Sequence, residues 1–406
     1  MIVIIRLLTT TCIVLLLTMG TGFFDLADAA PKKLKQQKSD RISSTWRKTF
    51  TTFNNYRAAA IATSDGGYLI TGSKGENAKD AGSSMWVMKT DSRGGVIWEK
   101  RFSPHKNSSN HGYAAIETAD GYLVTGTKNL SALHDWSVWN ELWVIKLAKN
   151  GATIWEKAYG CQWGANTSAG EGRSILQTDD GGYIVGGFGS IGGAVTAWLV
   201  RLDRNGNRQW EKFLGAADDG GGGFPVSVAK AAEGHFYASF TIPDVHAVVL
   251  KLDSSGTILW RRQVDQYQRN GAGSLIATSD EGVVFSGSGD HDGLLVKFDT
   301  NGSLRWHKTF GKNQQGRSAG LSAVTETTDN GFIATGGVGE GKSHLWLLRT
   351  DGRRNVVWDK EMSDKDLVTG YAVVQASDGG YVVCGRDDKG VAVWLLKLDA
   401  NGNHGK

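Results

Sequence analysis

Proline and cysteine are both scarce in this chain. Only 4 of its 406 residues are proline and 3 are cysteine. Proline has no backbone N–H to donate, so a low proline content is typical of chains built from many hydrogen-bonded strands. The cysteines are Cys12, in an apolar N-terminal segment, Cys161 and Cys384. Because the last two fall in well-separated units of the repeat described below, the sequence predicts no disulfide bond between them.

The chain also lacks a strong charge of one sign over most of its length. Its formal net charge is +4, but residues 30–41 hold five basic residues against one acidic residue and account for a net +4 by themselves. Residues 1–29 carry a net −1, which leaves +1 for residues 42–406. A net charge so close to zero over residues 42–406 argues against a nucleic-acid-binding surface. The basic segment is interpreted as a solvated, disordered tether; the alternative is contact with an anionic surface.

The first 29 residues have the features of a secretory signal peptide. Arg6 precedes an apolar stretch from Leu7 to Leu17, and residues 27–29, Ala-Asp-Ala, form a small-residue cleavage site. The mature protein would begin near Ala30 with a basic linker, residues 30–44, and would have no transmembrane span. The alternative is an uncleaved membrane anchor, although the polar threonines and a glycine in the segment weaken it as a span. We therefore expect a secreted or periplasmic protein.

Tryptophan marks an internal repeat. Seven of the 15 tryptophans sit in a short strand pattern, such as IWEKRF or RWHKTF, at intervals of 46 to 57 residues. They are Trp46, Trp98, Trp155, Trp210, Trp260, Trp306 and Trp358. Between them recurs an Asp-Gly turn followed by a β-rich run, such as DGGYLITG at Asp65 and DGGYVVCG at Asp378, with diverged copies at Glu233 and Asp280. Two further strand patterns complete each unit.

Four short strands per unit, joined by Gly, Asp and Asn turns, are typical of a β-propeller blade. The Asp-Gly element occurs seven times, whereas the tryptophan strand appears once before the first copy and is missing after the last. Residues 45–406 are therefore predicted to form an all-β, seven-bladed β-propeller of four-stranded antiparallel blades. We expect the N-terminal strand around Trp46 to complete the last blade and close the ring, which removes an exposed sheet edge.

A longer motif in these units has the form Asp-x-x-Gly-x-x-x-Trp. It begins at Asp91, Asp203, Asp253 and Asp299. The second unit has Ala148 in place of the Asp, and the sixth has Gly352 directly after Asp351. At the level of the repeat, over residues 45–406, the chain resembles the secreted quinoprotein-like, or PQQ-like, β-propeller repeat proteins. The quinone-dependent dehydrogenases of that group have eight blades and, in many members, adjacent cysteines. With seven units and no cysteine pair, this chain is similar to the non-enzymatic members, which implies no cofactor.

Three tryptophans fall outside the repeat and are the candidate binding residues. Trp136 and Trp139 lie in a long insertion of the second unit, and Trp163 lies in the connection after it. In a four-stranded antiparallel blade, the loop between the second and third strands and the connection from the fourth strand to the next blade emerge on the same face of the ring. These three side chains should therefore be neighbours on one rim. Tryptophan suits stacking on a sugar or anchoring a protein partner, and His134 and Asp135 could add polar contacts. The alternative is that the tryptophans only pack the insertion onto the ring.

No metal site is predicted. His105 and His111 lie in a connection on the same face, but neither their spacing nor that of His134 matches a metal signature. Asp203 opens a hairpin turn rather than a calcium loop, because the twelfth position of such a loop is Leu214 instead of Glu.

The expected function is that of a secreted or periplasmic binding or scaffold module, which presents its loop-rich rim to a protein or carbohydrate partner. The central channel is the expected second site. The alternative is an enzyme with a channel site, either a quinone-dependent oxidoreductase or a polysaccharide hydrolase or lyase; a purely structural spacer is a third alternative. We expect a monomer without a nucleic-acid partner.

Overall fold

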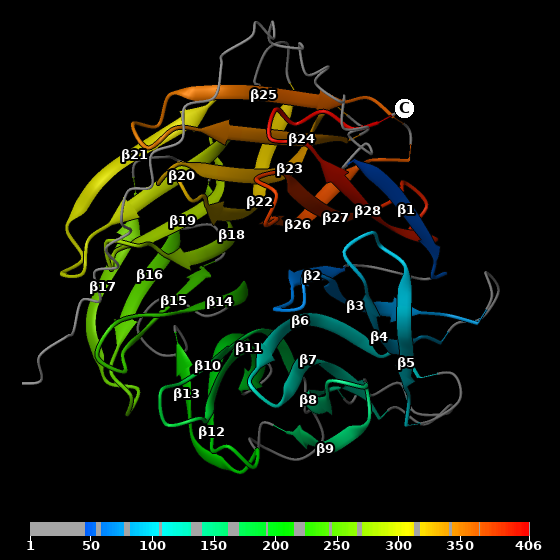
Figure 1. Ribbon diagram of the computed structural model, residues 1–406. Coiled ribbons are helices and arrows are strands. Elements are labelled where there is room, and N and C mark those ends of the chain that lie inside the picture. Colours follow the sequence, from blue (N-terminus) through cyan, green and yellow to red (C-terminus); the bar gives the residue numbers. More distant parts are fainter. Residues whose placement is uncertain are drawn as a thin grey trace, which may run out of the picture. The chain divides into compact units, whose positions relative to one another are not determined.

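The computed structural model describes residues 45–53, 58–76, 82–104, 108–130, 140–160, 170–191, 194–214, 224–242, 246–265, 270–311, 317–340, 343–364 and 366–405. These residues form 28 β-strands and no helix. It follows that none of the described segments is a helix of the length and apolarity needed to span a membrane. The strands form seven four-stranded antiparallel sheets, arranged as blades in a ring (Figure 1). The predicted all-β, seven-bladed propeller is confirmed.

Each blade contributes one strand to each of four positions, counted outward from the ring axis. The inner strands are β2 (Ala59–Ala62), β6 (His111–Thr118), β10 (Glu171–Gln177), β14 (Phe224–Lys230), β18 (Asn270–Ala277), β22 (Ser318–Glu326) and β26 (Thr369–Gln375). The second strands are β3 (Tyr68–Lys74), β7 (Gly121–Asn129), β11 (Tyr183–Ile191), β15 (Phe236–Thr241), β19 (Val283–Gly289), β23 (Phe332–Gly339) and β27 (Tyr381–Arg386). The third strands are β4 (Ser84–Thr90), β8 (Asn140–Ala148), β12 (Ala194–Leu202), β16 (Ala247–Leu252), β20 (Asp292–Phe298), β24 (His344–Thr350) and β28 (Ala392–Leu398). The outer strands are β5 (Val96–Phe102), β9 (Thr153–Tyr159), β13 (Arg208–Leu214), β17 (Ile258–Val264), β21 (Leu304–Phe310), β25 (Val356–Met362) and β1 (Trp46–Thr51).

The ring closes in the predicted way. Strand β1 pairs antiparallel with β28, from Trp46 opposite Lys397 to Thr51 opposite Ala392, and so becomes the outer strand of the seventh blade (Figure 1). Each inner strand contacts the inner strands of both neighbouring blades, and β26 contacts β2. The seventh blade is therefore built from both ends of the described chain, as expected from the position of Trp46.

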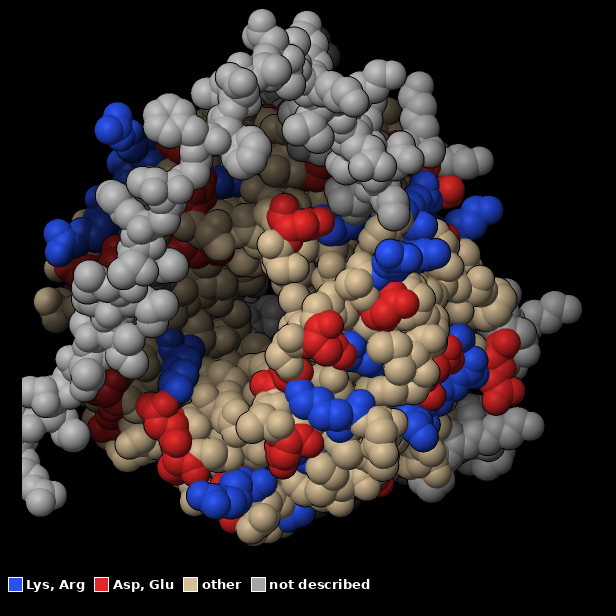
Figure 2. All heavy atoms as spheres, in the orientation of Figure 1, with Lys and Arg blue, Asp and Glu red and all other residues tan. Residues whose placement is uncertain are grey.

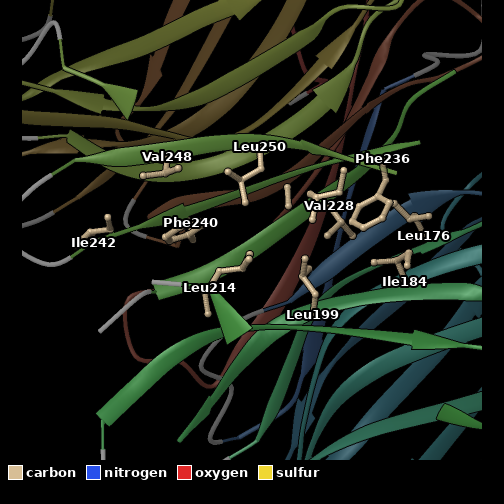
Figure 3. Packing of buried hydrophobic residues seen from close by; sticks show 13 residues of the cluster. Leu176, Ile184, Leu199, Leu214, Val228, Phe236, Phe240, Ile242, Val248 and Leu250 are labelled. Carbon is tan, nitrogen blue, oxygen red and sulfur yellow. The ribbon is translucent and has the colours of Figure 1, made fainter. Parts of the chain in front are cut away.

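The hydrophobic core lies between neighbouring blades. In the interface between the third and fourth blades, Leu176 and Ile184 pack with Val228 and Phe236 (Figure 3). Successive side chains of a strand point to opposite faces, so a blade that is buried on both faces needs apolar residues at nearly every position of its middle strands. The tryptophans of five third strands fill these interfaces and are at most 2% exposed. They are Trp86, Trp143, Trp198, Trp346 and Trp394.

The tryptophans of the outer strands hold each blade to the next. The indole of Trp210 lies against Gly256, in the turn before the following outer strand, where φ is +84° and an added Cβ would be 3.1 Å from the ring. The indole N–H donates to the carbonyl of Ser254 in the same turn at 3.2 Å. The pair formed by Trp98 and Gly151 has the same arrangement. The Gly of the repeated motif thus receives the tryptophan of the preceding blade.

The sixth blade keeps this geometry although its sequence departs from the motif. Arg354 occupies the position of the glycine, with a φ of +69°, while Gly352 lies two residues earlier. The Arg354 guanidinium lies 5.4 Å from the centroid of the Trp306 ring, so a cation–π contact replaces the contact of indole with glycine. The irregular spacing after Asp351 thus replaces the glycine that contacts the tryptophan by Arg354, while the sixth blade keeps its position in the ring.

A charged pair recurs at the same position in six blades. In the first, Lys89 on β4 has a side chain only 2% exposed, and its Nζ donates to Asp65 and to the Thr90 carbonyl. The six pairs are Asp65–Lys89, Asp120–Lys146, Asp180–Arg201, Asp280–Lys297, Asp329–Arg349 and Asp378–Lys397. In the fourth blade Glu233 stands in the turn, and Lys251 donates to the Thr300 carbonyl. The repeat contains both partners, yet nothing in their spacing indicates that they meet.

We expect the protein to lose stability as the pH falls from about 4 to about 2. Burial opposes ionisation of Asp65, but hydrogen bonds from Lys89 and Thr63 hold the pKa of that carboxyl at about 2, below the ordinary value of 3.8. The pKa values of the other five aspartates are lowered as well. A carboxyl whose pKa is lowered on folding stabilises the fold above its unfolded pKa and loses this contribution as the pH falls through its folded pKa.

Urea unfolding at pH 7, 4, 3 and 2 would measure this loss. Because the six carboxylate side chains are 44–69% exposed, each pair is expected to contribute only about 1 kcal/mol to the acid-sensitive part of the free energy of unfolding. The double variant Asp65→Asn/Lys89→Met removes one titrating pair, so its acid loss should be smaller by that amount. Equal acid losses in the variant and the original protein would contradict the assignment.

Candidate functional site

The two faces of the ring are built differently. On one face, which we call the turn face, inner strands connect to second strands and third strands to outer strands; eleven of these thirteen connections are five residues long. On the other, the loop face, the connections between successive strands range from two residues (192–193) to eleven (160–170). Uniform short turns leave little room for variation, whereas connections of unequal length can carry a specific function.

The aspartates of the turn face are used by the turns themselves. One carboxylate oxygen of Asp203 accepts the backbone N–H groups of Asn205 and Asn207, both at 2.8 Å. The same two bonds recur in five other turns, at Asp91, Asp253, Asp299, Asp351 and Asp399. The predicted hairpin turn at Asp203 is thus confirmed, and Asp399 makes the same turn after β28, the last strand. Where Figure 2 displays the surface, acidic and basic side chains alternate.

All five candidate binding residues lie outside the described residues. Trp136, Trp139, His134 and Asp135 fall within residues 131–139, and Trp163 falls within 161–169. Their position together on one rim stays a prediction. His105 is also outside the described ranges, while His111 is within them.

The strand ends that bracket the insertion of the second blade are fixed by amide side chains. Asn129, the last residue of β7, donates from Nδ2 to the Oδ1 of Asn140, the first residue of β8, at 2.8 Å. The side chain of Asn110, which is fully buried, accepts the Asn129 N–H at 3.0 Å and donates to the Ser83 carbonyl at 3.1 Å. These bonds tie the base of the insertion to both the first and second blades.

A cavity of about 130 Å³ lies on the ring axis. Its wall includes one residue from, or directly before, each of the seven inner strands: Ala58, Tyr113, Arg173, Ser227, Ser274, Ser322 and Tyr371. Since no other arrangement brings seven inner strands to one cavity, this is the neck of the central channel; Figure 2 shows the ring hollowed at its centre. Tyr113, Arg173, Ser322 and Tyr371 are bulged residues at which the strand register shifts. A bulge re-aims a side chain out of the ladder, here toward the axis.

A polar cluster adjoins the neck on its loop-face side. An Nη2 of Arg173 forms an ion pair with Glu171 at 2.6 Å, and the side chains are 21% and 12% exposed. The Arg173 guanidinium carbon lies 3.8 Å from the centroid of the Tyr113 ring, and Tyr113 also hydrogen-bonds to Glu171. The ring of His111 lies 5.8 Å from that of Tyr113. Two adjacent inner strands, β6 and β10, thus place four functional side chains at the channel.

Burial controls the protonation of this cluster. It raises the pKa of Glu171, although Arg173 and Tyr113 favour the ionised carboxylate. Burial and the nearby Arg173 charge lower the pKa of His111 to about 4, so the imidazole is neutral at pH 7. At neutral pH the cluster therefore holds one permanent cation, Arg173, beside a carboxyl group that retains its proton more readily than an exposed glutamate.

Sequence reasoning named the central channel as a second site but did not identify its residues, because they are about one repeat apart and belong to seven strands. One signal was present: Gly112-Tyr113, Gly172-Arg173 and Gly370-Tyr371 place a large side chain directly after a glycine near the start of an inner strand. An added Cβ on Gly172 would lie 2.0 Å from the Thr125 hydroxyl oxygen of the preceding blade. The glycine allows the close approach of two blades, and the following residue faces the axis.

Within the described residues, no group of three or more His, Cys, Asp or Glu side chains is arranged to hold a metal ion.

No family model matches the chain, and no curated protein matches its sequence. Among solved structures it is similar to puromycin hydrolase, at 12% identity and a TM-score of 0.52, covering 84% of this chain and 52% of that chain. It is also similar to Sqt1 of Chaetomium thermophilum, at 13% identity and a TM-score of 0.50, covering 86% and 95%. At these identities the likeness concerns the fold alone.

Proposed function

We propose that this chain is a secreted or periplasmic binding propeller that engages a protein or carbohydrate partner through its loop face. The observation that carries the proposal is the contrast between the two faces: one consists of near-identical short turns, and the other of connections from two to eleven residues long. The six repeated turns of Asp91, Asp203 and their counterparts use their carboxylates internally, so these six aspartates are not free to contact a partner. Recognition is therefore assigned to the loop face.

The partner is expected to contact the insertion of the second blade. Its tryptophans, Trp136 and Trp139, lie outside the repeat, unlike the twelve tryptophans that belong to the strands of the blades. Large aromatic side chains are the groups that most often dominate recognition of sugars and proteins. The hydrogen bonds of Asn110 and Asn129 anchor the base of the insertion, so a partner that binds it is held by the ring rather than by a free segment.

The test is a titration of the mature protein with a panel of glycans and with an extract of envelope proteins, followed by tryptophan fluorescence and calorimetry. Trp136→Ala/Trp139→Ala should lose binding while its thermal unfolding is unchanged. Ile97→Ala is the control, because Ile97 is a large apolar residue that is 57% exposed on an outer strand, away from the loop-face insertion. Binding that survives in the double variant would contradict the proposal. Export can be checked separately, since the exported protein should begin near Ala30.

A second candidate function, an enzyme with its site in the channel, is favoured by one observation. Glu171 is a buried carboxyl with a raised pKa beside a fixed cation, and such groups serve as general acids or bases in active sites. If this candidate is correct, Glu171→Gln should abolish the breakdown of a polysaccharide that the unchanged protein degrades, while binding of that polysaccharide persists.

A further inference from the structure

We propose that the neck of the channel binds a single carboxylate group, held by the Arg173 guanidinium and by hydroxyl groups of neighbouring inner strands. The inference does not rest on the proposed function, because its residues lie on the channel axis and include none of the insertion of the second blade. The two can therefore fail independently.

The guanidinium is fixed before any ligand arrives. It is stacked on Tyr113 at 3.8 Å, it lies 5.4 Å from the Phe188 ring centroid, and one of its edges is paired with Glu171. Its Nε is buried without a hydrogen-bond partner. An Arg that is held flat by aromatic rings loses little side-chain entropy when it binds an acceptor, and its planar N–H groups match the two oxygens of a carboxylate.

The backbone orients one hydroxyl group of the wall as a donor: Ser227 Oγ accepts the N–H of Leu275 at 3.1 Å. Ser274 Oγ accepts the N–H of Val324 at 3.1 Å, but it also lies 3.2 Å from Ser286 Oγ, which can accept its hydrogen. A hydroxyl that accepts a bond from the backbone keeps its own hydrogen to donate elsewhere. With Arg173, the wall therefore presents mainly donors to the cavity. A ligand group that only accepts hydrogen bonds suits it best, and an ionised carboxylate is such a group.

Size selects among carboxylate ligands. A cavity of about 130 Å³ has room for about four water molecules at roughly 30 Å³ each. That volume matches a carboxylate with one or two carbons, whereas a sugar ring or a nucleotide would extend out of the cavity. Two sources share this chemistry: a short free acid, or the tip of an acidic side chain that enters from the loop face.

Glu171 disfavours binding of the proposed carboxylate ligand. Its carboxylate occupies one edge of Arg173 and carries the same charge as the proposed ligand. Replacing it by Gln keeps an oxygen for Arg173 and for Tyr113 but removes the negative charge. Anion binding at the neck should consequently become stronger in Glu171→Gln, although the same substitution would weaken a site in which Glu171 itself contacts the ligand.

The experiment is an NMR titration of the mature full-length chain with sodium acetate, with neutral acetamide of the same shape, and with N-acetylglutamate amide. We expect acetate to shift the Arg173 Nε–H signal and the backbone amide signals of Tyr113 and Ser227, which are present in every variant, with a dissociation constant of about 1 mM, and acetamide to have no effect. Glu171→Gln should bind acetate at least about threefold more tightly. Arg173→Gln should bind at least about tenfold more weakly. Arg208→Gln, which breaks an exposed ion pair with Glu211 on β13, is the matched control and should bind normally.

Two further variants distinguish loss of binding from loss of folding. Arg173→Gln leaves Glu171 without its cation, so Glu171→Gln/Arg173→Gln, which is neutral at both positions, should fold and still fail to bind. Ser322→Leu fills the neck without changing any charge and should also abolish the shift. Equal binding of acetate and acetamide, or normal acetate binding in the neutral double variant, would overturn the proposal. If acetate binds and N-acetylglutamate amide does not, the natural ligand is a short free acid. If both bind, the natural ligand is the tip of an acidic side chain. Failure of the glycan and envelope-protein titration of the loop face would not change either result.

Discussion

A protein that begins at Thr52, and so lacks β1, is expected to lose its cooperative unfolding transition, whereas a protein that begins at Thr45 should melt like one that begins at Ala30. All six residues of β1 pair with β28. The strand also contacts the first blade: the Trp46 ring lies 6.0 Å from that of Tyr68, and the Phe50 ring lies 6.3 Å from that of Trp86. One strand therefore joins the last blade to the first.

The size of the effect follows from the groups that are lost. Removing a well-packed aromatic side chain costs about 3 kcal/mol or more, and the deletion removes two of them together with the backbone hydrogen bonds of β1. A typical domain is stable by only about 5–15 kcal/mol, so the shortened protein should be largely unfolded or aggregated. Aggregation is expected because the deletion leaves β28 as an unpaired sheet edge.

Circular dichroism during heating and size-exclusion chromatography would measure both consequences. The protein that begins at Thr45 is the control, since it keeps β1 and the hydrogen bond from the Gly405 N–H to the Thr45 hydroxyl. A protein that begins at Thr52 and melts at the same temperature as this control would show that the ring does not depend on β1.

The fold could be predicted from the sequence because its decisive signals are local and repeated. Trp98 and Trp210 lie at equivalent points of two units, and the missing strand after Asn403 accounts for the extra one at Trp46. Antiparallel strands with short turns then leave little choice of topology. Where the local signal was misleading, as at Gly352, the structure shows that a different residue, Arg354, adopts the required positive φ.

The residues of the channel neck could not be predicted because they depend on which residue of each inner strand is bulged. Arg173 and Glu171 are separated by one residue, and in a regular strand they would face the same side of the sheet. The register shift between Gly172 and Ser174 places Arg173 at the axis, where it meets Tyr113 of the preceding blade. The buried pair of Lys89 and Asp65 illustrates the same limit: each residue belongs to a recognisable element, but the contact between the elements is made in three dimensions.

Trp210→Ala is expected to lower the free energy of unfolding by about 3 kcal/mol. The indole packs against the core between the third and fourth blades, lies 6.3 Å from the Phe236 ring, and donates to the Ser254 carbonyl. Because the ring is only half-buried, the loss should fall at the lower end for a large aromatic residue. Trp139→Ala, in the insertion, is expected to leave the melting temperature unchanged. Equal shifts in both variants would contradict the division into structural and spare tryptophans.

A double-mutant cycle with Gly256→Ala tests the contact itself. An alanine at this position has two costs: the positive φ, which disfavours any side chain by about 1 kcal/mol, and a Cβ placed 3.1 Å from the Trp210 ring. In the Trp210→Ala background the second cost disappears, so Gly256→Ala should be less destabilising there than in the unchanged protein. If the indole did not lie on the glycine, the two substitutions would act additively. Coupling between them would therefore show that the repeated Gly and Trp act as one unit across the blade interface, which is why the motif recurs in the sequence at the spacing of the blades.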